Sequence, residues 1–253
     1  MTTFQLSRWS FAIRRLRPFW AAGFGCLLLA VSCFVNGLAT GAELTFLKEG
    51  KPDPTALLAP PPLMDSPEQN ADMEEVKMVF HAASEGDKKA AHAEKQFSAF
   101  NFADAIGPWF VSNNVPKTAE FFNKVQLDAE EVTSIGKKYF KRPRPYTTDP
   151  SLANGKLETS FSYPSGHSTE SMVIALVLAD LFPDKSDAII AQARMMGWHR
   201  VQIARHYSTD IYAGRVLAQA IVREMEKDSD FKKALAQAEK EVAAARQLAK
   251  SAN

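Results

Sequence analysis

Helical periodicity is the feature of this 253-residue sequence that most restricts the folds it can adopt. From about Ala71 onward, apolar residues recur at three- and four-residue spacing, as in Met73, Val76, Val79 and Phe80. The sequence contains no sustained period-2 alternation, which would indicate strands, and no internal repeat. The sequence therefore predicts an all-α fold, a single-domain helical bundle.

The periodicity and its breaks predict where the helices lie. Four helices are expected before the middle of the chain, at about 71–83, 87–105, 117–127 and 128–141. The segment Pro143–Leu157 is rich in Pro, Thr, Asp, Asn and Gly and is expected to be a loop. Three helices are expected after it, at about 166–181 (ended by Pro183), 185–204 and 209–226. The Ala- and charge-rich tail, about 231–250, predicts a last helix with a thin apolar stripe.

Residues 1–42 have the pattern of a secretory signal peptide. A positive region from Arg8 to Arg17 precedes an apolar run from Phe19 to Val35, and small residues follow as far as Ala42. Cleavage after Ala42 or Ala39 predicts a periplasmic or secreted mature protein. Two alternatives stay open: a retained anchor, because the apolar run approaches a spanning length, and a lipoprotein, because Leu29–Cys33 loosely resembles a lipobox.

The composition after residue 42 excludes several classes of protein. Of the 30 basic residues, 26 remain there against 29 acidic residues, a formal charge of −3. This mildly acidic body argues against a nucleic-acid-binding surface and against a membrane-surface patch, and no stable membrane insertion of the mature chain is expected. Both cysteines, Cys26 and Cys33, lie in the signal, so the mature protein would have no disulfide, thiol nucleophile or thiolate metal site.

The sequence is expected to divide into four segments. Residues 1–42 are the signal peptide, and residues 43–70 form an extended Pro-rich N-terminal segment that should lie over the surface. Residues 71–228 are the catalytic helical domain, and residues 229–253 are a C-terminal helical tail.

Three short clusters carry the chemistry of the sequence. They are Lys137 with Arg144-Pro145, then Pro164-Ser165-Gly166-His167, then Arg200 with His206 and Asp210. Together they supply three cations, two imidazoles, one carboxylate and a Ser-Gly turn at a helix start, where free N–H groups favour an anion. Each cluster alone has an ordinary structural explanation. The ordered set indicates a site that binds a phosphate-like oxyanion and exchanges a group on its central atom.

The residue types predict how such an anion would be bound. Lys137, Arg144 and Arg200 would hold its oxygens, the arginines through planar forks and the lysine as a point charge. Gly166 would let the backbone approach closely, and Ser165 would add a hydroxyl donor.

The remaining polar residues near these clusters receive structural interpretations. The cations next to the first cluster are expected on a solvated face; they are Lys138, Lys141 and Arg142. His81 and His92 are interpreted as structural or surface residues.

The ordered pattern Lys-x6-Arg-Pro, Pro-Ser-Gly-His and Arg-x5-His-x3-Asp resembles that of the type 2 phosphatidic acid phosphatase superfamily. The chain looks most like its soluble branch, the bacterial class A non-specific acid phosphatases, from about Leu57 to Met225. The resemblance implies a helical bundle of the type 2 phosphatidic acid phosphatase and vanadium haloperoxidase kind. One position departs from the pattern: His199 stands where the family has Ser, and it either hydrogen-bonds near the site or faces solvent.

The resemblance implies roles for the two histidines. His206 is the nucleophile and forms a phosphohistidine, and His167 is protonated and gives its proton to the leaving alkoxide. Asp210, at a helix start capped by Ser208 or Thr209, would accept the other ring N–H of His206. Because one imidazole must start neutral and the other charged, activity should have a bell-shaped dependence on pH. The resemblance implies a pH optimum on the acid side.

The predicted function is a metal-independent acid phosphatase that acts on small phosphomonoesters. No His-Glu-x-x-His and no Asp-rich loop is present in the sequence, so no metal or other cofactor is expected. Three alternatives stay open: a vanadium-dependent haloperoxidase, a lipid-phosphate phosphatase and a phosphate-binding protein without turnover. A homo-oligomer is also left open.

Overall fold

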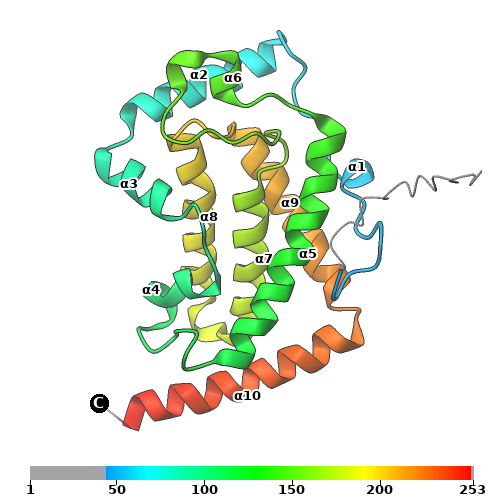
Figure 1. Cartoon of the computed structure of the whole chain (residues 1–253), viewed down its shortest axis with the longest axis vertical. Coiled ribbons are helices and arrows are strands. Elements are labelled where there is room, and N and C mark those ends of the chain that lie inside the picture. Colours follow the sequence, from blue (N-terminus) through cyan, green and yellow to red (C-terminus); the bar gives the residue numbers. More distant parts are fainter. Residues whose placement is uncertain (1–43, 252–253) are drawn as a thin grey trace, which may run out of the picture. The chain divides into compact units, whose positions relative to one another are not determined.

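The computed structural model describes residues 44–251, so the predicted signal peptide lies outside the described residues. Every regular element within 44–251 is a helix, which confirms the predicted all-α class. Four long helices run side by side, α5 (Pro116–Phe140), α7 (Gly166–Leu181), α8 (Ser186–Gln202) and α9 (Ser208–Met225) (Figure 1). Of these, α7 packs against each of the other three.

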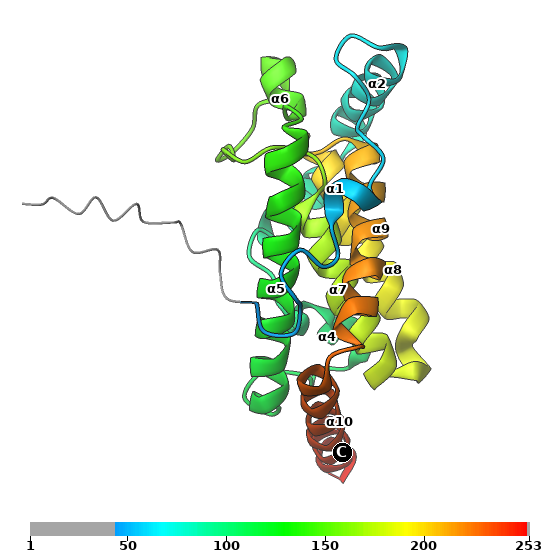
Figure 2. The same ribbon diagram turned by 90° about the vertical axis from the view of Figure 1, so that its right-hand side faces the viewer.

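The other elements surround this group. The short α1 (Pro54–Leu57) lies against α5, and α3 (Glu85–Ala93) and α4 (Ala103–Ile106) lie against α8. The helix α2 (Pro67–Ala82) packs on α8 and α9 (Figure 2), and α10 (Ser229–Ser251) crosses one end of α5 (Figure 1). The remaining short helices are α6 (Pro145–Thr148), η1 (Ala99–Phe102), η2 (Pro150–Leu152) and η3 (Pro183–Lys185).

The helix α7 forms the centre of the core. Its side chains Val173, Ile174, Ala175 and Leu178 are fully buried. A helix that is apolar on most of its circumference is stable only when other elements cover it, and here α5, α8 and α9 do so. Within residues 44–251, no helix has both the length and the apolar character needed to cross a bilayer.

The predicted C-terminal helix is present as α10. Its thin apolar stripe is buried through Phe231, Ala238 and Val242. The Glu241 carboxylate of α10 accepts the backbone N–H groups of Lys117 (3.1 Å) and Thr118 (2.7 Å). These N–H groups belong to the first turn of α5, where a helix has no internal acceptors. The tail therefore caps α5 as well as covering it.

The N-terminal segment, residues 43–70, is expected to be extended and to lie over the surface, and the structure differs on both points. Phe46, Leu47 and Leu58 are buried in the core, and residues 54–57 are helical. The Asp128 carboxylate on α5 accepts the N–H groups of Thr45 (2.8 Å), Phe46 (2.7 Å) and Leu47 (3.1 Å). This buried carboxylate holds the N-terminal segment against α5. The proline content of the segment does not predict such a contact.

Several predicted helix limits are wrong. The expected helix at 87–105 is interrupted, because α3 ends at Ala93 and the Ser98 side chain then caps the separate turn η1. The two helices expected at 117–127 and 128–141 are one helix, α5, since no Pro or Gly interrupts the chain at 127–128. The expected loop Pro143–Leu157 contains α6 and η2, each of which begins at a proline.

The starts of α7 and α9 approach each other closely at Gly214. A Cβ atom on Gly214 would lie 2.9 Å from the backbone oxygen of Ser165 and 3.0 Å from the Cβ of Ser168. Only a glycine leaves room for this contact. It brings the turn that carries His206 against the turn that carries His167.

Candidate active site

A cavity of about 250 Å³ between α5 and α7 is lined by residues from all three sequence clusters. Lys137, Arg144, Gly166, His167 and His206 line it. The other three predicted site residues lie behind this lining and are described below; they are Ser165, Arg200 and Asp210. The fold therefore brings the distant clusters to one anion-sized hollow.

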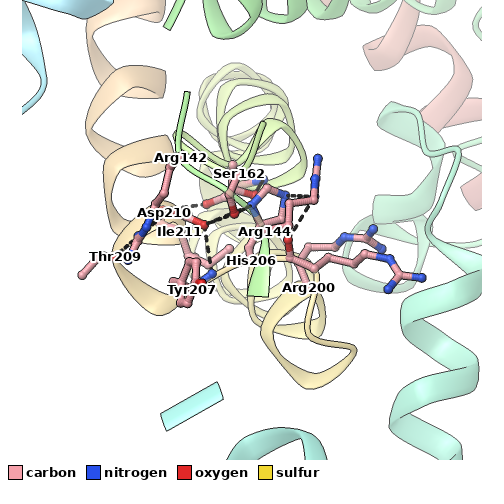
Figure 3. Close-up of polar contacts among 12 residues, drawn as sticks. Arg142, Arg144, Ser162, Arg200, His206, Tyr207, Thr209, Asp210 and Ile211 are labelled. Atoms are coloured by element: carbon pink, nitrogen blue, oxygen red, sulfur yellow. Dashed lines mark hydrogen bonds and ion pairs between the residues drawn. The ribbon is translucent and has the colours of Figure 1, made fainter. Parts of the chain in front are cut away.

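His206 lies in the turn before α9 and is 1% exposed. Its Nδ1 is 3.4 Å from Asp210 Oδ2 and 3.4 Å from Ser162 Oγ. Its Nε2 is 3.2 Å from Arg144 Nη1 (Figure 3). Because a guanidinium has donors only, the ring must present a lone pair at Nε2 and carry its proton at Nδ1. This is the tautomer that a nucleophilic Nε2 requires.

The surroundings of His206 keep its ring neutral. Burial lowers the pKa of His206 well below its ordinary value, and the cations Arg144 and Lys137 lower it further. Glu158 opposes these effects but does not outweigh them. His206 thus stays neutral to more acid pH than an ordinary histidine, which keeps its Nε2 lone pair unprotonated.

Asp210 is fully buried in the first turn of α9. Its Oδ2 accepts the N–H of Tyr207 (2.9 Å) and the hydroxyl of Ser162 (2.5 Å). The predicted cap at Ser208 or Thr209 is wrong: the N-cap is Tyr207, because the Asp210 carboxylate itself satisfies the N–H at the cap. The carboxylate is thereby held rigidly beside the His206 ring.

Arg142 is the clearest error of the sequence interpretation, which placed it on a solvated face. It is 3% exposed and forms ion pairs with Asp72 (2.6 Å) and Asp210 (2.7 Å). Its guanidinium also donates to Gln69 Oε1 (2.6 Å) and Thr209 Oγ1 (2.7 Å). The residue therefore links α2 to the carboxylate that orients His206.

The two arginines among the phosphate-binding candidates, Arg144 and Arg200, are also buried. Arg144 donates to the backbone oxygen (2.7 Å) and hydroxyl (2.9 Å) of Ser160, and Arg200 donates to the backbone oxygen of Ala91 (3.2 Å). Both guanidiniums meet the carboxylate of Glu158. Sequence reasoning missed Glu158, because a single glutamate in a polar loop carries no recognisable pattern.

Lys137 lies in the last turn of α5, and its Nζ donates to the backbone oxygen of Phe161 (2.7 Å). Burial lowers the pKa of Lys137 to about 7, and the neighbouring Arg144 adds to the effect. Its charge thus disappears near neutral pH.

The start of α7 differs in detail from the prediction. Ser165 is its N-cap, with Oγ accepting the N–H of Ser168 (3.4 Å), and its own N–H donates to the Asp210 backbone oxygen (3.1 Å). Ser165 is therefore occupied in holding α7 to α9. The N–H groups of Gly166 and His167 remain as the helix-start donors nearest the cavity.

His167 has a fixed orientation at the cavity. Its Nε2 is 3.2 Å from the backbone oxygen of Glu94, an acceptor, so Nε2 carries a proton and Nδ1 is the site that titrates. Burial lowers the pKa of His167 to about 3, helped by Arg200 and opposed by Glu158. His199, the departure from the family pattern, binds the side chain of the same Glu94 (Nδ1 to Oε2, 2.8 Å).

Among residues 44–251, no three His, Cys, Asp or Glu side chains lie in positions to hold one ion.

Comparisons with known proteins identify relatives of the chain. Residues 127–228 match the family model described as the PAP2 superfamily. A non-specific acid phosphatase of Providencia stuartii is 28% identical over 219 residues, which is 82% of this chain and 88% of that protein. An acid phosphatase of Zymomonas mobilis subsp. mobilis is 28% identical over 208 residues, 77% of each chain.

Among solved structures, a transmembrane PAP2 type phosphatidylglycerolphosphate phosphatase from Bacillus subtilis is similar to this chain. It is 19% identical with a TM-score of 0.45, over 63% of this chain and 84% of that one. The sequence comparisons confirm the predicted superfamily, and the class A branch stays a prediction.

Proposed function

Because the chain carries a PAP2 superfamily domain at residues 127–228, we propose that it is an acid phosphatase that hydrolyses phosphomonoesters through a phosphohistidine at His206, without a metal. One observation supports this most: the neutral His206 ring has its lone pair at Nε2, beside Arg144, and its other nitrogen beside Asp210. The similarity to two bacterial acid phosphatases supports the same activity.

The first half of the reaction follows from this arrangement. Lys137, Arg144 and Arg200 bind the phosphoryl oxygens, and His206 Nε2 attacks phosphorus as the bond to the leaving oxygen breaks. Asp210 stabilises the positive charge that develops on the ring. His167 gives a proton to the leaving oxygen, which departs as an alcohol.

In the second half, water attacks phosphorus and the P–N bond breaks. His167, now neutral, accepts the proton of the water, and His206 returns to its neutral form. The pKa of His167 is about 3 in the free cavity, and the negative charge of a bound phosphoryl group raises it. Activity therefore increases toward acid pH, where more His167 is protonated in the complex.

The predicted export of the protein is part of the same proposal. The arginine-flanked apolar run before Ala42 supports cleavage of a signal peptide and a periplasmic or secreted enzyme. Small phosphomonoesters in that compartment are its proposed substrates.

Phosphate release from p-nitrophenyl phosphate should persist in excess EDTA, because the cations of the site take the place of a metal. The measurement is the rate of nitrophenol formation by the purified protein before and after chelation. A zinc-dependent alkaline phosphatase, assayed in parallel, shows that the chelation is effective. Loss of activity in this protein, restored by a divalent cation, would contradict the metal-free mechanism.

The Michaelis constant should rise above pH 7. Lys137 is charged below its pKa of about 7 and neutral above it, and Glu170, whose pKa burial raises to about 7, becomes negative over the same range. Losing a charge-assisted hydrogen bond costs ~1.5–3 kcal/mol, a rise of roughly 10- to 100-fold. The test is KM measured from pH 5 to 9.

Two variants separate the contributions to this rise. Lys137→Arg keeps its charge and should flatten the increase, whereas Glu170→Gln should remove only the part due to the new carboxylate. An identical rise in wild type and Lys137→Arg would show that Lys137 does not bind the substrate.

A further inference from the structure

Glu158 holds both arginines of the candidate phosphate site. Its Oε2 is 2.6 Å from Arg144 Nη1 and its Oε1 is 2.8 Å from Arg200 Nη2. A third guanidinium, that of Arg205, lies 4.0 Å from Oε1. One carboxylate thus uses its two oxygens as a phosphoryl group would use two of its own, since both groups match the planar fork of arginine.

The position of this carboxylate is the one that a substrate needs. Glu158 lines the same cavity as Lys137, His167 and His206. The donors of Arg144 are already engaged, with Ser160, with the Arg205 backbone oxygen, with His206 Nε2 and with Glu158. A phosphoryl group can bind Arg144 only by replacing one of these partners, and Glu158 is the one with a matching charge.

The Glu158 side chain can leave this position while its backbone stays fixed. Tyr146 Oη donates to the Glu158 backbone oxygen (2.8 Å) and accepts the Glu158 N–H (3.2 Å). The Glu158 side chain is 25% exposed, whereas those of Arg144 and Arg200 are 4% and 2% exposed. A rotation of the side chain therefore takes the carboxylate into water and leaves the arginines in place.

We propose that Glu158 is an internal ligand of the phosphate site, which holds Arg144 and Arg200 in the free protein and is displaced by the phosphoryl group of the substrate. This inference rests on the proposed function, because that function assigns the two arginines to the substrate. Anions that bind the two arginines no better than the Glu158 carboxylate does are excluded. After the reaction, the carboxylate returns to the arginines and helps to expel the product phosphate.

The protonation state of Glu158 agrees with this role. Burial raises the pKa of Glu158, but the neighbouring cations, Arg144 first and also Arg200, outweigh it and lower the pKa to about 2. The carboxylate is therefore charged, and competes with a phosphoryl group, at any pH well above 2.

The test is the affinity for inorganic phosphate, measured by titration calorimetry on wild type and Glu158→Gln. Removing the competing carboxylate should lower the dissociation constant for phosphate by roughly tenfold or more, because the two arginines no longer have to leave their ion pairs with Glu158 before they bind phosphate. Glu130→Gln is the matched control, because Glu130 lines the same cavity and no contact to either arginine is found for it within residues 44–251. Its effect should stay below about threefold.

A second measurement keeps the test valid if Glu158→Gln is less stable. Phosphate should raise the Tm of Glu158→Gln more than that of wild type, because stabilisation by a ligand grows as its Kd falls. Glu158→Asp, which keeps the charge but is shorter, should bind phosphate with intermediate affinity.

Two results have different meanings for this inference. Unchanged or weaker phosphate binding by Glu158→Gln would overturn it and make Glu158 a residue that positions the arginines. Absence of turnover in wild type, with phosphate binding that still tightens in Glu158→Gln, would overturn the proposed function alone.

Discussion

Replacing His206 with alanine should lower kcat by roughly 10⁴-fold or more, the size of effect seen when a covalent nucleophile is removed. The ring is 1% exposed and lies with Nε2 beside Arg144 at the cavity. Brief mixing of wild type with a labelled phosphomonoester, followed by alkaline quenching, should trap label on the protein that acid then releases. The variant should trap none.

Two comparisons make the result specific. His81→Ala removes an exposed histidine on α2, away from the cavity, and should keep wild-type turnover. His167→Ala should still form the phosphoenzyme with an activated leaving group such as nitrophenol, which needs no proton, but should release alkyl alcohols poorly. Label that persists in His206→Ala would assign the nucleophile to another side chain.

The fold class was predictable from the sequence, and several contacts that place the site were not. Helical spacing and the position of Pro183 were enough to predict α7 with its observed limits. The separation of α3 from α4 depends on Ser98 and on packing against α8, which a propensity argument does not contain. Local patterns thus predicted the helices, whereas tertiary contacts decided where they start and stop.

The residues of the site likewise divide into those that the sequence predicted and those that only the structure shows. Lys137, His167 and His206 stand in short motifs, and their convergence on one cavity followed from the ordered set. Arg142 and Glu158 stand in no motif, because their roles come from partners far along the chain. Charged residues of this kind are ordinarily solvated, so only the structure distinguishes them from surface residues.

Arg142 should be the most important of these residues for stability. Replacing it with methionine, which is similar in length, would leave Asp72 and Asp210 buried without their shared cation. Removing one partner of a buried ion pair costs about 3–5 kcal/mol, more than an isolated surface ion pair contributes. The free energy of unfolding, measured in urea, should fall by that amount.

The control for this substitution is Lys138→Met, which removes an exposed cation near the same end of α5. Its unfolding free energy should change by no more than about 0.5 kcal/mol. Arg142→Lys keeps the charge but lacks the fork that reaches both carboxylates, so its stability should lie between those of the two methionine variants. Equal stability of Arg142→Met and Lys138→Met would mean that the ion pairs of Arg142 with Asp72 and Asp210 do not stabilise the fold.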